Sequence, residues 1–275
     1  MSLDPQSLSK IVSSRSLDLS KLEFKHKGPL DERSFQKRLD ELLESYGSYG
    51  YRAYILLGNL QIRRTTDYNG RLMLYSRVIF FSKKIKSKEM IKIIFGDSPR
   101  YKEIEDSIDK YAKNGGLYLP QKLEDHTIRE AEIDALVIAR GYDSKLFLYN
   151  IELKRGLIKK DKKYKKAHLQ LFRSTDVLIN ALLETEIISK DSEFYTFSIL
   201  YSRYWYGTVY LFVYKNGNLY AYYVNNENKS IKYQIPLNGP EMKKYAYYSK
   251  DDFEYSMEKR GIIPYLVGFR KSQEL

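Results

Sequence analysis

Apolar positions in the first hundred residues recur with spacings that predict one helix, several strands and a second helix. A helix is expected from Asp31 to about Tyr46, because apolar residues recur there every three or four positions and Gly47 follows. The next elements are strands at 51–57, 60–66 and 71–81, with the turn sequence DYNG between the last two, and a helix at about 86–95. Residues 1–30 are polar and basic and are expected to be loosely ordered.

A break at Gly96-Asp97-Ser98-Pro99 divides the predicted elements, because Pro99 favours the start of a new helix. After it we expect a helix at 99–113, a strand at 116–122, a hairpin at 132–154, a helix at 160–183 and strands at 193–201, 207–214 and 218–225. This order indicates an α/β or α+β fold class with a mixed β-sheet flanked by helices. We expect an N-terminal α+β part at 1–98, a core at 99–240 and a C-terminal extension at 241–275.

The hairpin carries charged residues in otherwise apolar strands. Residues two apart in a strand share a face, so Glu132 and Asp134 are expected on one face and Ile133, Ala135 and Val137 on the other. A turn centred near Asp143 places Asp134 opposite Glu152, and Glu132 opposite Lys154. Two carboxylates that close repel each other unless a cation lies between them.

The composition narrows the choice of that cation. The chain has no cysteine and only three scattered histidines, which excludes disulfides and zinc ribbons and leaves oxygen ligands for Mg²⁺ or Mn²⁺. The net charge of +12 indicates a polyanionic partner, although a merely basic protein is the alternative. Together with a lysine beside the carboxylates, these features indicate metal-assisted hydrolysis of phosphodiesters.

The sequence Ile133-Asp134, followed by Ile151-Glu152-Leu153-Lys154, resembles the signature of the PD-(D/E)XK nuclease superfamily. This superfamily includes restriction endonucleases, archaeal Holliday-junction resolvases and lambda-type exonucleases. Its core is a helix, three strands, a helix and a strand, which is the order expected over residues 99–215. The chain departs from the motif in having Ile133 in place of the proline.

The resemblance implies a role for each matching residue. Asp134, Glu152 and the carbonyl of Leu153 would bind Mg²⁺ or Mn²⁺, and Lys154 would be the catalytic lysine. Many members add a glutamate from the first helix, for which we choose Glu105 over Glu103 because Glu105 borders the apolar stripe of the helix at 99–113. Some members also carry a glutamine in the second helix, here Gln170, which would contact phosphate or orient Lys154. Glu132 is expected to pair with Lys154 rather than to bind a second metal.

A dense basic run follows the proposed catalytic lysine. Phosphates approaching the site would meet positive side chains at the start of the second helix, at Lys159, Lys160, Lys163, Lys166 and Arg173. We therefore expect a metal-dependent nuclease acting on nucleic acid, with DNA favoured over RNA. The alternative is a catalytically inactive nucleic-acid-binding or structural protein with the same fold.

The remaining expectations concern context. The N-terminal part would serve substrate recognition or form a homodimer. No apolar run suits a membrane helix or signal peptide, so an intracellular, cytoplasmic location is expected, and the 27 tyrosines with abundant lysine fit a heat-adapted source.

Overall fold

The computed structural model describes residues 3–22, 31–46, 51–64, 71–75, 78–81, 87–111, 121–122, 130–154, 162–202, 205–235 and 237. Its helices are α1 (Pro5–Arg15), α2 (Glu32–Tyr46), α3 (Ser87–Phe95), α4 (Tyr101–Tyr111) and α5 (Lys162–Glu184), with a short 3-10 helix η1 (Leu19–Lys21). Its strands are β1 (Tyr51–Arg64), β2 (Arg71–Tyr75), β3 (Val78–Phe81), β4 (Gln121–Lys122), β5 (Glu130–Gly141), β6 (Leu146–Lys154), β7 (Phe194–Ser202), β8 (Tyr206–Lys215), β9 (Asn218–Asn225) and β10 (Ser230–Ile235). These elements form an α+β fold.

The ten strands described belong to one mixed sheet in the order β10-β9-β8-β7-β6-β5-β1-β2-β4, with β3 also paired to β1. Most neighbours are antiparallel, as tight turns such as Asn216-Gly217 between β8 and β9 require. Strands β6 and β7 are parallel, because α5 carries the chain back between them.

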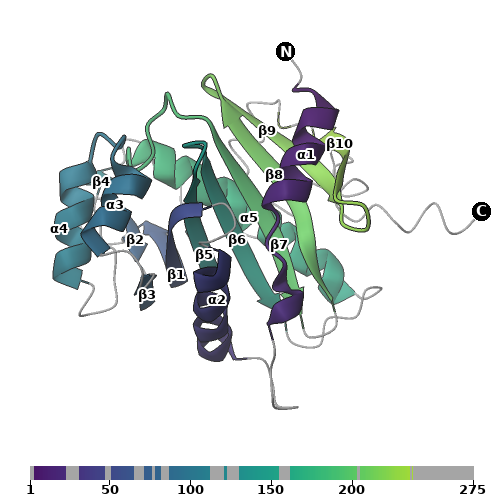
Figure 1. Cartoon of the computed structure of the whole chain (residues 1–275), viewed down its shortest axis with the longest axis horizontal. Helices are drawn as coiled ribbons and strands as arrows, with labels where there is room; N and C mark the ends of the chain where they lie inside the picture. The colour runs from purple at the N-terminus through teal and green to yellow at the C-terminus, as the bar shows by residue number, and fades with distance from the viewer. Residues whose placement is uncertain are drawn as a thin grey trace, which may run out of the picture.

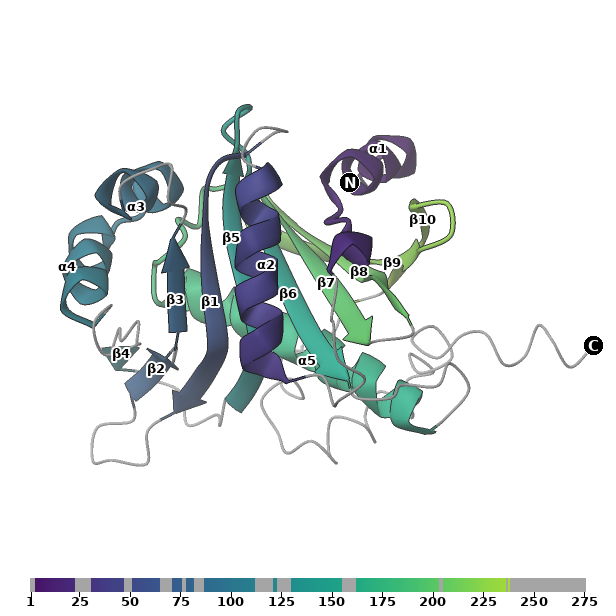
Figure 2. The same cartoon turned by 60° about the horizontal axis from the view of Figure 1, so that its bottom comes forward.

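Helices cover both faces of the sheet (Figures 1 and 2). Helices α1 and α2 and η1 pack on one face, and α3 and α5 pack on the other, with α4 against α3. The sheet therefore separates two apolar cores. One core is formed with Phe35, Leu39 and Leu43 of α2, and the other with Leu171, Phe172 and Leu178 of α5.

Helix α2 forms where the apolar stripe predicts it. It begins beside Asp31, whose carboxylate accepts hydrogen bonds from the backbone N–H groups of Arg33 at 3.0 Å and Ser34 at 3.4 Å. The helix then runs alongside β1 and β5 (Figure 2). The expected bounds of α5 are also confirmed to within two residues.

The centre of the sheet differs from the sequence expectation. The two strands expected at 51–57 and 60–66 are one continuous strand as far as Arg64, where the described residues end, and this strand β1 pairs along most of its length with β5. The strand expected at 116–122 is described only at Gln121–Lys122, where it pairs with β2 at the end of the sheet. The neighbour of β5 is therefore β1, and the sheet continues across the break near Pro99.

The N-terminal segment is also more ordered than expected, because residues Pro5–Arg15 form α1. Asp4 caps this helix by accepting from the N–H groups of Gln6 at 3.2 Å and Ser7 at 3.0 Å, and Pro5 occupies the first turn, where its missing N–H costs nothing. The apolar side chains that anchor the helix are Leu8 and Val12, both buried.

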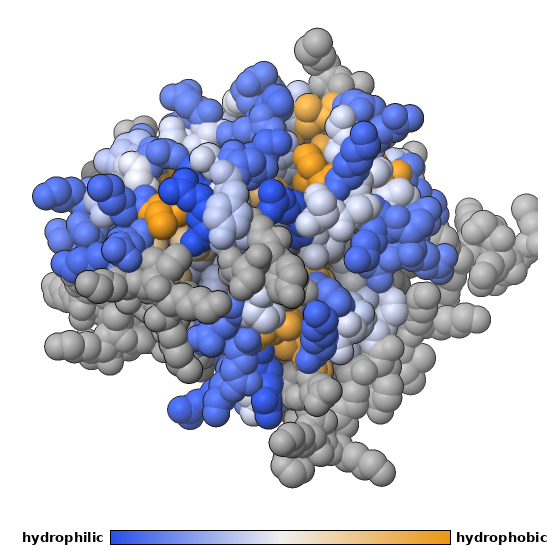
Figure 3. Space-filling model, in the orientation of Figure 1, coloured by the Kyte–Doolittle hydropathy of each residue, from blue (hydrophilic) through white to orange (hydrophobic). Residues whose placement is uncertain are grey.

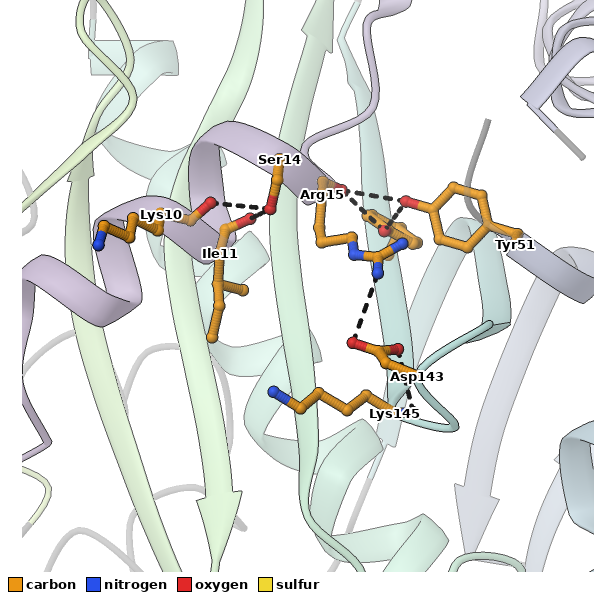
Figure 4. Close-up of polar contacts among 8 residues, drawn as sticks. Lys10, Ile11, Ser14, Arg15, Tyr51, Asp143 and Lys145 are labelled. Carbon is orange, nitrogen blue, oxygen red and sulfur yellow. Dashed lines mark hydrogen bonds and ion pairs between the residues drawn. The ribbon is translucent and has the colours of Figure 1, made fainter. Parts of the chain in front are cut away.

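The end of α1 is held against the turn of the β5–β6 hairpin (Figure 4). The carbonyl of Arg15 accepts hydrogen bonds from the hydroxyl groups of Tyr149 at 2.8 Å and Tyr51 at 3.2 Å. The Arg15 guanidinium pairs with Asp143 at 3.4 Å and lies over the ring of Phe147. Local capping and these long-range contacts together explain an ordered helix in a polar segment.

The outer face carrying α1 and α2 is mostly hydrophilic, with small, separate apolar patches (Figure 3). Within the ranges given above, no helix has both the length and the apolar character needed to cross a membrane.

Candidate active site

The β5–β6 hairpin brings the predicted carboxylates together. The two strands pair from Arg140 with Leu146 to Ala135 with Ile151, which is the register expected from a turn at Asp143. One step beyond the last pair, this register places Asp134 beside Glu152. There β5 continues along β1, whereas β6 continues along β7 as far as Lys154. The carboxylates therefore lie where the two strands separate.

The alternation of side chains changes at Asp134. Ala135 and Val137 are buried in the α2 core, whereas Ile133 is buried in the α5 core, so the expectation that all three share one face is wrong. The paired strand β1 changes at the same level, because Leu56 lies in the α2 core and Leu60 in the α5 core. A regular strand would keep residues four apart on one face.

Asp134 and Glu152 are held by different partners. The backbone N–H of Leu153 donates to Asp134 Oδ2 at 2.6 Å. Lys154 Nζ donates to Glu152 Oε1 and, at 3.0 Å, to Gln170 Oε1 on α5. The Glu152 side chain is 2% exposed and that of Lys154 is 27% exposed, so the lysine reaches from the surface to the buried carboxylate. These described contacts of Lys154 do not include the expected partner Glu132, which is exposed.

The surroundings of both carboxylates favour their protonated forms. Burial raises the pKa of Asp134 to about 8, and the charge of Glu152 acts in the same direction, against the Leu153 N–H and Lys154. Burial also raises the pKa of Glu152, although the ammonium group of Lys154 opposes this effect. A buried and a half-buried acid that both have raised pKa values, next to a lysine, are typical of a functional site.

The helix glutamate that lies near the two carboxylates is on α2, not on the predicted helix at 99–113. Glu32, in the first turn of α2, is close enough for its charge to raise the pKa of both Asp134 and Glu152. Glu105 lies on α4 at the edge of the molecule (Figure 1), where it accepts a hydrogen bond from Tyr101 at 3.2 Å. The alternative, Glu103, pairs with Arg100. The structure thus does not bring either predicted glutamate to the hairpin.

The sequence does contain a signal for Glu32. It lies at the start of an amphipathic helix that precedes the first strand, and it becomes a candidate once 51–64 is treated as the strand beside the hairpin. The sequence-based choice fell on Glu105 because the core was taken to begin at Pro99, which made the helix at 99–113 the first helix.

The carboxylates of the hairpin meet some of the requirements of a site for a hard divalent cation. No group of three or more His, Asp or Glu side chains within the described ranges is arranged closely enough to hold a metal ion. Mg²⁺, however, commonly binds through only one or two carboxylates and keeps several waters. Asp134 and Glu152 meet that requirement, since they are adjacent and repel each other when both are ionised.

The predicted basic run is only partly described. Lys159 and Lys160 fall outside the described residues, and Lys163 and Lys166 lie in the first turns of α5, where only the backbone is described. Arg173 is half-buried on α5. The placement of α5 nevertheless brings this end of the helix to the end of β6 that carries Lys154.

A buried polar cluster lies under the site and was not predicted. Asn150 is fully buried on β6 and donates through its amide to Ser174 at 2.9 Å and Thr175 at 2.8 Å on α5. Thr175 in turn bonds to Ser198 on β7 at 2.8 Å. Because Ser174 is one turn after Gln170, this cluster fixes the position of Gln170 relative to Lys154.

Comparison with known proteins adds no relative: no family model, no curated protein and no solved structure matches the chain.

Proposed function

We propose that this protein is a divalent-metal-dependent nuclease of the PD-(D/E)XK type, which hydrolyses phosphodiester bonds in nucleic acid. The observation that carries the proposal is the convergence of Asp134, Glu152, Lys154 and Gln170 where β5 and β6 separate. Buried carboxylates at such a point have no structural advantage over apolar residues. A catalytic use explains why the chain retains them.

The order of the central elements supports the same proposal. Helix α2 is followed by the antiparallel strands β1, β5 and β6, then by α5 and the parallel strand β7. This is the order of the superfamily core: a helix, three strands, a helix and a strand. Elements β2 to β4, with α3 and α4, would then be an insertion between the first and second core strands.

In this proposal Asp134, Glu152 and the Leu153 carbonyl hold the cation, with Glu32 as an additional acid from α2. A bound Mg²⁺ or Mn²⁺ supplies Lewis acidity toward the phosphate oxygens. Lys154, oriented by Gln170, neutralises charge that develops on the phosphate. The water gives up a proton to solvent as its oxygen bonds to phosphorus, the bond from phosphorus to the leaving oxygen breaks, and the leaving oxygen takes up a proton from solvent.

Nucleic acid is the substrate class that the charge of the chain favours. The net charge of +12 attracts a polyanion, and the basic run directly follows Lys154 in sequence. We propose DNA in preference to RNA as the substrate on the resemblance alone.

The test is a cleavage assay on labelled single-stranded, double-stranded and branched DNA and on RNA, with Mg²⁺ or Mn²⁺. We expect Asp134→Asn, Glu152→Gln and Lys154→Met each to reduce the rate by about 100-fold or more. Glu227→Gln, in the turn between β9 and β10, and Lys190→Met, between α5 and β7, remove matched charges from exposed positions outside the candidate site and should leave the rate unchanged. Circular dichroism checks that each variant is folded.

Two outcomes would count against the proposal. Cleavage of no substrate with either metal by the folded wild-type protein would reject it, and metal-independent binding to nucleic acid would then favour the inactive binding protein. Equal rates for the wild type and all three site variants would place the activity elsewhere.

A further inference from the structure

Gln36 is a buried polar residue whose amide reaches the backbone of Asp134. It lies on α2, is 1% exposed, and donates through Nε2 to the Asp134 carbonyl at 2.6 Å. An apolar side chain would pack against the sheet at lower desolvation cost. The value of a glutamine at this position therefore lies in the hydrogen bond.

Gly58 on β1 provides the space for this amide. A Cβ atom at Gly58 would lie 2.5 Å from Cδ, 2.6 Å from Oε1 and 2.7 Å from Nε2 of Gln36. The described glycine with a positive φ is Gly217, so Gly58 is needed for space and not for its backbone conformation. The glycine of β1 thus leaves room for the α2 side chain that bonds to the Asp134 carbonyl.

The contact lies where β5 is irregular. Gly58 pairs with Ala135, which is next to Asp134. At this level the regular alternation of side chains between the two apolar cores is interrupted in both β1 and β5. A backbone that leaves regular geometry needs an added restraint to hold a single conformation. The Gln36 amide supplies that restraint at the residue whose carboxylate belongs to the site.

The same helix also carries Glu32. Glu32 and Gln36 are four residues apart and therefore lie on one side of α2, one turn from each other. Fixing Gln36 to Asp134 consequently holds the first turn of α2, and with it the Glu32 carboxylate, beside the hairpin.

We propose that Gln36 is a positioning residue of the metal site: its hydrogen bond to the Asp134 carbonyl, made possible by Gly58, sets the geometry of Asp134 and Glu32 for the cation. This inference rests on the proposed nuclease function. Residues that orient metal ligands typically contribute about 10–100-fold to metal affinity.

Two substitutions break the hydrogen bond from opposite sides. Gln36→Met keeps the length of the side chain and removes the donor. Gly58→Ala displaces the amide, which is the end of a flexible side chain and can move without shifting α2. Lys37→Met makes the same replacement at the next, exposed position of α2 and is the matched control.

Mn²⁺ binding, measured by isothermal titration calorimetry, is the main readout. We expect Gln36→Met and Gly58→Ala to weaken binding by about tenfold, and Lys37→Met to leave it unchanged. In cleavage assays at a fixed Mn²⁺ concentration, kcat should fall while KM for the oligonucleotide stays constant. The double variant Gly58→Ala/Gln36→Ala removes the clash, so it should regain the melting temperature lost in Gly58→Ala but not the Mn²⁺ affinity.

The results separate this inference from the proposed function. If the wild type binds Mn²⁺ and cleaves, but Gln36→Met and Gly58→Ala bind it as tightly as wild type, Gln36 is only a packing residue and the nuclease function stands. Lower melting temperatures with unchanged Mn²⁺ affinity lead to the same conclusion. If the folded wild type neither binds Mn²⁺ nor cleaves, both proposals are rejected.

Discussion

At the scale of single residues, the hairpin holds two acids in surroundings that disfavour their charge. Asp134 lies near Glu152 and accepts a hydrogen bond from the backbone N–H of Leu153. Glu152 accepts a hydrogen bond from the ammonium group of Lys154, which stabilises its charged form. A protein without a cation must therefore either keep a proton on this pair or accept the repulsion between two buried charges.

This situation predicts how the stability of the metal-free protein depends on pH. An unfolded aspartate loses its proton near pH 4, whereas Asp134 in the folded protein keeps its proton until about pH 8. The stabilising contribution of this proton is fully present below pH 4 and is lost as the pH rises toward 8. The free energy of unfolding in EDTA should fall by at most about 1.4 kcal/mol per pH unit, the limit for one proton.

Urea unfolding between pH 5 and pH 8 measures this slope, and Asp134→Asn should flatten it. Asp191→Asn, at an exposed position, is the control and should keep the wild-type slope. A wild-type stability that rises over this interval would contradict the raised pKa of Asp134.

At the scale of elements, the position of α5 on the sheet determines whether Gln170 meets Lys154. That position is set by the buried amide of Asn150, which bonds to Ser174 and Thr175 one turn beyond Gln170. Two further buried hydrogen bonds, between Thr175 and Ser198 on β7 and between His168 and Tyr210 on β8, also hold the helix on the sheet.

We therefore expect Asn150→Leu to destabilise the protein by about 1–3 kcal/mol, because it leaves buried hydroxyl groups with fewer partners. The rate of cleavage should also fall, since Gln170 loses its fixed position. Chemical denaturation measures the first effect. Asn180→Ala, on the same helix at a half-buried position, loses one local bond to Asp176 and should cost about 0.5 kcal/mol or less.

Patterns within short stretches of sequence were sufficient to predict the helices and the hairpin whose formation depends on neighbouring residues. The apolar stripe of Phe35, Leu39 and Leu43 fixed α2, and the turn at Asp143 fixed the register that joins Asp134 to Glu152. Gln170 was chosen on the resemblance, which implies a glutamine in the second helix, and in the structure its Oε1 accepts a hydrogen bond from Lys154 Nζ at 3.0 Å.

Contacts between distant segments could not be predicted in this way. The pattern of apolar residues in β1 predicts a strand but does not identify its partner. That partner is β5, which lies more than sixty residues later in the sequence. This missing pairing also hid Glu32, because the partner of the hairpin decides which helix is next to the site. The interruption of side-chain alternation at Asp134 involves β1 and β5 together, and the sequence of either strand alone does not predict it.

At the scale of the whole molecule, one sheet joins segments from both sides of the break near Pro99, with β1 between β5 and β2 and with β9 and β10 at the opposite end. The candidate site uses only α2, β5, β6 and α5. The end of the sheet formed by β9 and β10 is therefore remote from the chemistry, and its partner α1 is remote as well (Figure 1).

The attachment of α1 has a consequence for the order in which the molecule opens. Ser9 accepts from the Ile231 N–H at 3.0 Å, and such contacts join residues more than two hundred positions apart. We expect them to form late in folding, because closing a loop of this length costs conformational entropy before the contacts are gained. An 11-residue helix has little stability of its own once they are lost.

Hydrogen exchange measured by mass spectrometry should therefore show the amides of residues 5–15 exchanging by local opening, while those of β6 and β7 exchange only on global unfolding. Because Arg15 ties α1 to the hairpin turn and not to the end that carries the candidate site, the proposed cleavage should persist at temperatures where α1 already exchanges freely. Equal protection of α1 and β7 would show instead that the N-terminal helix belongs to the same cooperative unit as the site.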